Sequence, residues 1–206
     1  MEFTADKVRN DILSLSESDF VIEYILKTDV WYFSEYLKLN PSDFIQKLDL
    51  FKKIVSANLD ISFNNVLIVG SGKIGFSLSP THKLLRKFDG DENKESDIDV
   101  AIISEKYFQE LWNVFRKEYC RRYIRPYNEI ASSVFRGFIN EDVLSEVPEI
   151  RRVWQEKVNG ANLILKNDIP IRHQINYRIY RSWEDLQEYH INGVRKAKEK
   201  LNERGV

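Results

Sequence analysis

The feature that most constrains this fold is a short apolar run that ends abruptly in glycine. Val66-Leu67-Ile68-Val69 is followed at once by Gly70-Ser71-Gly72. An unbroken run of aliphatic and β-branched residues, bounded by turn-forming residues, is typical of a buried strand. The sequence therefore predicts a strand over 66–69 that leads directly into a glycine-rich turn.

A second predicted strand, over 97–103, carries two acids. In Asp97-Ile98-Asp99-Val100 the acids alternate with apolar residues. Because successive side chains of a strand point to opposite faces, both carboxylates are expected on one face. A third strand is expected near 170–180, where polar and β-branched residues alternate. These strands predict an α/β or α+β fold, in which helices wrap a small mixed sheet.

Helices are expected around these strands. Residues 5–59 have helical character throughout, and capping signals mark helix starts at Ser16 and Asn40. An amphipathic helix is expected over 105–121.

The remaining helical segments are interrupted by proline, glycine and polar residues. We expect a short helix near 81–88, followed by an exposed loop. The region up to about 160 should be mostly helical, with breaks at Pro126, Pro148 and Gly160. A capping signal at Ser182 begins the last helix.

We interpret the chain as three consecutive parts. Residues 1–60 form an N-terminal helical portion, 61–181 form the core, and 182–206 form a C-terminal helix that packs on the core.

The amino-acid composition limits which binding partners and which cellular compartment are expected. With 31 Lys+Arg against 32 Asp+Glu, the net charge of −1 gives no long-range field that would attract nucleic acid. Cys120 is the only cysteine, which excludes an internal disulfide or a cysteine-rich metal site and favours a reducing compartment. No run approaches the roughly 20 apolar residues of a membrane span, and the N-terminus is too charged for a signal peptide. We expect a cytoplasmic protein with no membrane partner.

The glycine-rich turn admits two interpretations. Gly70, Gly72 and Gly75 satisfy the G-x-G-x-x-G spacing of a dinucleotide-binding turn, which would make the protein an oxidoreductase. That interpretation needs a helix immediately after Gly75 and several further parallel strands. Alternatively, the turn works together with Asp97 and Asp99: a Gly-Ser turn presents N–H groups and a hydroxyl to phosphate oxygens, while paired carboxylates hold divalent metals.

The segments G-S-G-K-I-G-F-S and S-D-I-D-V-A-I-I, in this order, resemble the nucleotidyltransferase superfamily, which includes DNA polymerase beta and poly(A) polymerases. The resemblance covers residues 66–103. It implies a sheet of the nucleotidyltransferase type, with Gly70 and Ser71 contacting the phosphates. Asp97 and Asp99 would be the catalytic, metal-binding pair that coordinates Mg²⁺ or Mn²⁺.

Three further residues complete the expected site. Lys73 is a candidate phosphate ligand because it sits in the turn, and Arg178 is one because of its expected strand face. The family usually carries a third carboxylate on a following strand. Here the polar face of the third strand has no acid, and Asn176 takes that place as an amide-oxygen ligand to the metal. Asp168 and Glu184 are other acids that could serve.

The function implied by the resemblance is transfer of a nucleoside monophosphate from an NTP or dNTP to an acceptor hydroxyl. The acceptor stays open between a partner protein, a nucleotide and an oligonucleotide, and a homo-oligomer is compatible with the sequence. Small bacterial members of that superfamily include proteins of antiphage defence and of toxin–antitoxin systems, and the resemblance implies a role of this kind. Because the third acid is missing, a catalytically degenerate binding or sensor module is the alternative, and the dinucleotide-binding oxidoreductase is a third.

Overall fold

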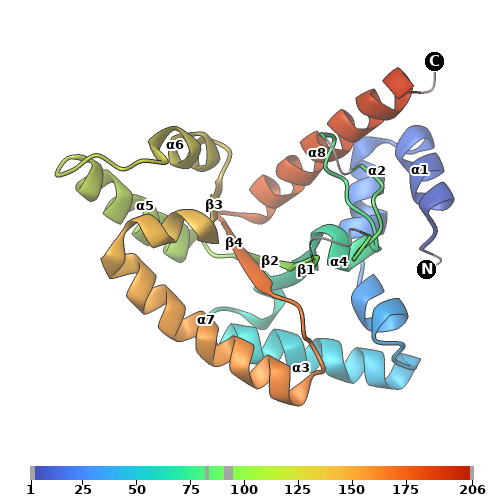
Figure 1. The fold of residues 1–206 in the computed structure, drawn as a ribbon, viewed down its shortest axis with the longest axis horizontal. Helices are drawn as coiled ribbons and strands as arrows, with labels where there is room; N and C mark the ends of the chain where they lie inside the picture. Colours follow the sequence, from blue (N-terminus) through green and yellow to red (C-terminus); the bar gives the residue numbers. More distant parts are fainter. Residues whose placement is uncertain (1–2, 82–83, 91–94, 205–206) are drawn as a thin grey trace. The chain divides into compact units, whose positions relative to one another are not determined.

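The computed structural model describes residues 3–81, 84–90 and 95–204, and combines helices with one four-stranded sheet (Figure 1). The mixed helix-and-sheet class expected from the sequence is confirmed. The α-helices are α1 (Ala5–Ser14), α2 (Glu17–Val21), α3 (Pro41–Leu59), α4 (Gly70–Ile74), α5 (Glu105–Tyr119), α6 (Tyr127–Phe135), α7 (Pro148–Asp168) and α8 (Trp183–Arg204). Shorter helical segments are the π-helical η1 (Ile22–Leu26) and η2 (Tyr32–Tyr36), and the 3₁₀-helical η3 (Phe63–Asn65) and η4 (Glu141–Glu146).

The sheet has the strand order β1-β2-β4-β3. Its strands are β1 (Val66–Val69), β2 (Ile98–Ile103), β3 (Phe138–Asn140) and β4 (Ile175–Tyr180). β3 and β4 are antiparallel, with Phe138 opposite Tyr180 and Asn140 opposite Arg178. The predicted strands at 66–69 and 97–103 are confirmed, apart from Asp97, which lies just before β2.

The other two strands differ from the expectation. β3 was not predicted, because a strand of three residues is too short to show an alternating pattern. The predicted strand near 170–180 begins only at Ile175.

The chain forms two compact units that are each assembled from separated stretches of sequence. The first unit comprises Met1–Gln46, Ile68–Asp99 and Gln187–Val206, and the second comprises Lys47–Leu67 and Val100–Leu186. The boundary between them falls within α3, β1, β2 and α8. The division into parts at 1–60, 61–181 and 182–206 stays a prediction.

The core of the first unit is formed by aromatic and aliphatic side chains of the N-terminal helices. Phe20 and Tyr24 are buried and stack with ring centroids 4.4 Å apart. The Tyr24 hydroxyl donates a hydrogen bond to Asp11 Oδ2 at 2.5 Å. Burial, reinforced by this contact, raises the pKa of the Tyr24 phenol, so the hydroxyl stays a donor at neutral pH.

Helix α8 adds an apolar stripe and a polar tie. Val194, Ala197 and Leu201 are buried, at the spacing of one helical face. Lys198 Nζ donates to the backbone oxygen of Leu15 at 2.9 Å, which ties α8 to the end of α1. None of the described helices is both long enough and apolar enough to cross a membrane.

The predicted helix starts at Ser16, Asn40 and Ser182 are confirmed by side-chain caps. Each of these side chains accepts a hydrogen bond from the backbone N–H three residues later, at 3.1, 2.9 and 3.2 Å respectively. Such caps satisfy one of the N–H groups that the first helical turn leaves without a partner.

The helix expected near 81–88 is wrong for its described residues; 82–83 lie outside the described part of the chain. Here the backbone folds back on itself instead. Phe76 and Lys87 form an isolated antiparallel bridge, and the Phe88 N–H donates to the Gly75 oxygen at 2.9 Å. Leu84 and Phe88 are both buried and lie four residues apart, which is the spacing of apolar residues on one face of a helix. Their burial results from this fold-back rather than from a helix.

The break predicted at Gly160 is also wrong, because this residue lies inside α7. A Cβ at Gly160 would lie 3.0 Å from Asn58 Oδ1 on α3. Glycine at this position allows α7 to approach α3 closely, and it does not mark a break in the helix.

A partly buried polar cluster joins three elements of the second unit. Glu141, at the start of η4, accepts hydrogen bonds from Trp154 Nε1 at 2.9 Å and from the Tyr177 backbone N–H at 2.8 Å. The Tyr177 hydroxyl donates to Asn162 Oδ1 at 2.7 Å. Glu141 follows the last paired residue of β3, so its side chain satisfies the next N–H of β4 after the strand pairing ends.

We predict that Glu141→Ala destabilises the protein by about 1–3 kcal/mol, because it leaves two buried N–H donors without an acceptor. Urea unfolding of the variant and the wild type measures this difference. Glu156→Ala, at an exposed position of α7, is the matched control and should change the free energy of unfolding by less than about 0.5 kcal/mol. Equal effects of the two substitutions would contradict the assigned role.

The same carboxylate predicts a pH dependence. Burial raises the pKa of Glu141 above its ordinary value of 4.5, although its two hydrogen bonds partly oppose this shift. Folding therefore disfavours the ionised form. The stability of the wild type relative to Glu141→Gln should be greatest below about pH 4.5 and should decrease as the pH rises through the raised pKa. Denaturation of both proteins across this range tests the sign, and a difference that grows with pH would contradict it.

Candidate functional site

The glycine-rich segment after β1 is a single helical turn. Gly70 begins α4 directly at the end of the strand, with φ at +65°, and Gly75 ends it in the left-handed conformation with φ at +83°. The Gly75 N–H donates to the Ser71 oxygen at 2.8 Å. Both glycines adopt a backbone conformation that residues with a Cβ rarely reach, so the chain needs glycine at each end of this turn.

The Asp99 carboxylate lies against the backbone of Gly70. A Cβ at Gly70 would lie only 2.4 Å from Asp99 Oδ2, closer than real atoms approach. A Cβ at Gly72 would lie 3.8 Å from Ile98 Cγ2, an ordinary contact distance, so α4 also packs on the start of β2. The fold therefore brings the glycine turn and the Asp-x-Asp segment together within the first unit.

The polar groups of this segment are reachable from solvent. Gly70, Ser71, Asp97 and Asp99 are all half-buried. Ile98 and Val100, which alternate with the two acids, are fully buried. Ile98 and Val100 thus lie in the core, whereas the two acids lie outside it.

Trp31 supports the far end of the turn, which the sequence did not reveal. A Cβ at Gly75 would lie 2.7 Å from Trp31 Nε1. The indole is buried, at 7% exposure, and packs against Phe88 with ring centroids 5.6 Å apart. The only sequence signal was Gly75 itself, which indicates close packing but does not identify the residue that packs there.

Lys73 lies on the packed side of α4. Its side chain is only 4% exposed, and Nζ donates a hydrogen bond to the Lys27 backbone oxygen. Lys27 caps the C-terminal end of η1, where backbone oxygens have no helical partner. Lys73 therefore ties α4 to η1.

Arg178 and Asn176 belong to β4 in the second unit. Arg178 Nε donates to Asn140 Oδ1 at 2.7 Å, and the guanidinium lies over the Phe138 ring, 5.4 Å from its centroid. Asn176 Oδ1 accepts a hydrogen bond from Gln174 Nε2 at 2.9 Å. Both side chains are half-buried.

The long connection between α4 and β2 is closed at its base. Asp89 and Ser96 bond reciprocally: each backbone N–H donates to the other residue's side-chain oxygen at 2.9 Å. Residues 91–94 of the predicted exposed loop lie outside the described part of the chain. These two hydrogen bonds fix the point at which the chain re-enters the sheet, immediately before Asp97.

In the described part of the chain, no group of three or more His, Cys, Asp or Glu residues could hold a metal ion. Asp97 and Asp99 are therefore not part of a larger group of such ligands among the described residues. The other two acids considered from the sequence lie in the second unit. Asp168 ends α7, and its backbone oxygen accepts from Lys47 Nζ at 2.6 Å. Glu184 is exposed in the first turn of α8, where a hydrogen bond to its own backbone N–H lowers the pKa of its carboxyl.

We predict that Gly70→Ala destabilises the protein by roughly 1–3 kcal/mol and displaces the Asp99 carboxylate, because the new methyl group needs both a strained φ and the space that Oδ2 occupies. Gly193→Ala is the control. Gly193 lies within α8, and a Cβ there meets nothing within 4 Å, so this change should stabilise by roughly 0.5–1 kcal/mol through helix propensity. Thermal unfolding distinguishes the two, and a neutral Gly70→Ala would rule out the close packing of Asp99.

No protein-family model, curated protein or solved structure matches this chain. The function must therefore be argued from the chemistry of the residues that the fold brings together.

Proposed function

We propose that the chain is a metal-dependent nucleotidyltransferase that moves a nucleoside monophosphate from an NTP or dNTP to an acceptor hydroxyl. The observation that supports this most directly is the packing of Asp99 against Gly70. The two halves of the motif are 29 residues apart in the sequence and adjacent in space. A glycine turn beside paired carboxylates is the arrangement that brings phosphate groups and divalent cations together.

The two carboxylates fit a divalent cation. Asp97 and Asp99 offer hard oxygen ligands of the kind that Mg²⁺ and Mn²⁺ prefer, and both are half-buried, so that an ion can approach them from solvent. A bound Mg²⁺ would neutralise phosphate charge and polarise the phosphoryl group. The absence of a Cβ at Gly70 is what allows Asp99 to lie at the turn.

The remaining residues of the turn bind and orient the donor. The Ser71 hydroxyl donates a hydrogen bond to a phosphate oxygen, and the backbone at Gly70 allows that phosphate a close approach. Holding the donor in a fixed orientation next to the acceptor hydroxyl lowers the entropic part of the barrier to transfer. Lys73 has no part in this proposal, because its buried ammonium bonds to a backbone oxygen.

The acceptor is a hydroxyl group of a partner protein, a nucleotide or an oligonucleotide. The resemblance to small bacterial nucleotidyltransferases favours a role in antiphage defence or in a toxin–antitoxin system. In both settings, a transferred nucleotide changes the activity of a partner or acts as a signal.

A second candidate is a nucleotide-binding module that no longer turns over its ligand. The described residues offer two acids at this site and no third, and fewer carboxylates bind the cations more weakly. Such a module would bind NTP with Mg²⁺ and release no pyrophosphate.

The test is incubation of the protein with each labelled NTP or dNTP and Mg²⁺ or Mn²⁺, followed by separation of protein-linked, oligonucleotide and small-molecule products. We expect turnover in the wild type and its loss, by at least about a hundredfold, in Asp97→Asn and Asp99→Asn. Asp49→Asn, which removes an exposed carboxylate of α3, is the charge-matched control and should retain full activity.

The outcomes separate the two candidates. Nucleotide binding that depends on Asp97 and Asp99 without any product would support the binding module and exclude the enzyme. Turnover that survives both substitutions would exclude the proposed site. Thermal unfolding checks the fold of each variant, and a loss of several kcal/mol would instead mark the acids as structural.

A further inference from the structure

A cavity of about 470 Å³ lies in the second unit between α5 and α6, where the site proposed above has no residue. Its volume is within the range of small-molecule binding sites, which is roughly 300–1,000 Å³. The inner wall is apolar and contains Phe115, Ile124 and Ile130, which are all buried. The cavity is therefore large enough, and apolar enough, for a ring-containing ligand.

Aromatic side chains form the entrance. Tyr119 at the end of α5 stacks on Tyr127 at the start of α6, with ring centroids 4.4 Å apart and planes 20° from parallel. Both rings are substantially exposed, at 49% and 41%, and both line the cavity. Trp112, half-buried, lines it as well. Flat, partly exposed rings of this kind offer faces on which a planar ligand stacks.

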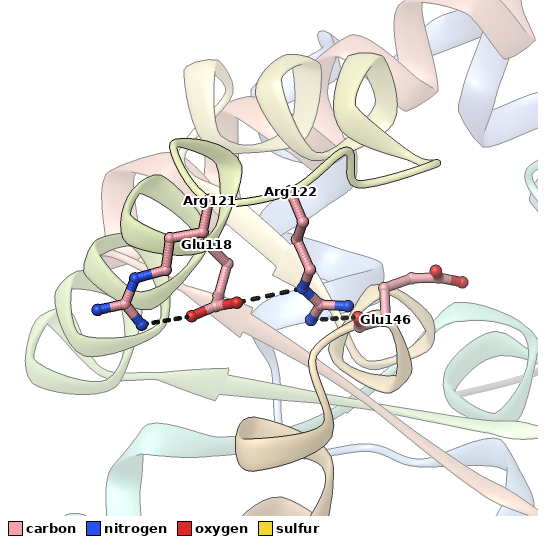
Figure 2. A network of polar contacts seen from close by, with 4 residues as sticks. All are labelled: Glu118, Arg121, Arg122 and Glu146. Carbon is pink, nitrogen blue, oxygen red and sulfur yellow. Dashed lines mark hydrogen bonds and ion pairs between the residues drawn. The ribbon is translucent and has the colours of Figure 1, made fainter.

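The charged lining is entirely basic. Arg116, Lys117 and Arg121 line the cavity, and among the described residues that line it none is acidic. Glu118, also on α5, forms ion pairs with Arg121 at 3.2 Å and with Arg122 at 3.1 Å (Figure 2). Arg122 also reaches the Glu146 backbone oxygen at 3.1 Å (Figure 2).

Arg116 and Lys117 lie outside the network of ion pairs drawn in Figure 2. Neither forms an ion pair with any residue that the structure describes, and both are exposed at the cavity. The Arg116 guanidinium lies 6.0 Å from the centroid of the Trp112 ring, a cation–π arrangement that holds it beside an aromatic wall. Two cations next to stacked aromatic rings favour a ligand that carries an anionic group on a planar ring.

We propose that this cavity binds a small molecule that joins a planar aromatic ring to a phosphate or carboxylate. The ring packs against Trp112 and against the stacked pair of Tyr119 and Tyr127, and the anionic group lies at Arg116 and Lys117. A nucleoside monophosphate and an aromatic carboxylic acid share this chemistry.

Calorimetry with 5′-AMP and with 2-naphthoate distinguishes these two sources, with adenosine and 2-naphthamide as their uncharged counterparts. We expect at least one of the anions to bind, and its uncharged counterpart to bind at least about tenfold more weakly. Because the proposed nucleotidyltransferase site also takes a nucleotide, the AMP titration is repeated in Asp97→Asn/Asp99→Asn. Affinity retained in that variant belongs to the cavity, so failure of one proposal is distinguishable from failure of the other.

Two substitutions and one chemical probe locate the site. Arg116→Gln should weaken binding by about tenfold, whereas Lys106→Gln, which removes an exposed charge from the other end of α5, should leave it unchanged. Ala131→Trp fills the cavity and should abolish binding. Cys120, the only cysteine, lines the cavity and is exposed, so bound ligand should slow its alkylation by N-ethylmaleimide.

The proposal is overturned if neither anion binds, or if the uncharged compounds bind as tightly. It is equally overturned if Lys106→Gln weakens binding as much as Arg116→Gln does, or if saturating ligand leaves the alkylation rate of Cys120 unchanged. If Ala131→Trp does not fold, the comparison of Arg116→Gln with Lys106→Gln still decides the outcome.

Discussion

The contact between the Gly70 backbone and the Asp99 carboxylate is the constraint on which the candidate site depends. The strand that ends at Val69 and the strand that begins at Ile98 each follow from local apolar patterning, but their polar ends can meet only where no Cβ intervenes. The second unit uses the same device, since a Cβ at Gly137 would lie 2.3 Å from Asp185 Oδ1. In both places a glycine with positive φ makes room for a carboxylate.

The polar groups of this chain divide into those that hold the fold together and those that remain accessible. Lys73 and Glu141 are buried or largely buried, and their hydrogen bonds go to the backbone or to a neighbouring indole. Asp97, Asp99 and Ser71 are half-buried at the glycine turn. Burying an unpaired charge is costly, so the hydrogen bonds of Lys73 and Glu141 are needed by the fold. The side chains at the glycine turn keep the solvent access that a ligand needs.

The sequence predicted some of the elements around the candidate site and not others. The strands at 66–69 and 97–103, and the helix caps, could be predicted because each depends on short-range patterns of apolar and capping residues. The helix expected near 81–88 failed because Leu84 and Phe88 have helical spacing but are buried by a chain reversal. The position of Lys73 in the turn predicts a phosphate ligand, but its burial depends on η1, which is more than 40 residues earlier in the chain.

The sequence by itself determined which residue types stand at the turn and on the strand, and therefore which chemistry is proposed for this segment. Tertiary structure alone decided that Asp99 packs on Gly70, that Trp31 closes the turn at Gly75, and that α5 and α6 enclose a basic, aromatic cavity. The physical reason is that strand alternation and helix capping act within one element, whereas these contacts join side chains and backbone of different elements. Such contacts follow from how whole elements pack, which no local pattern records.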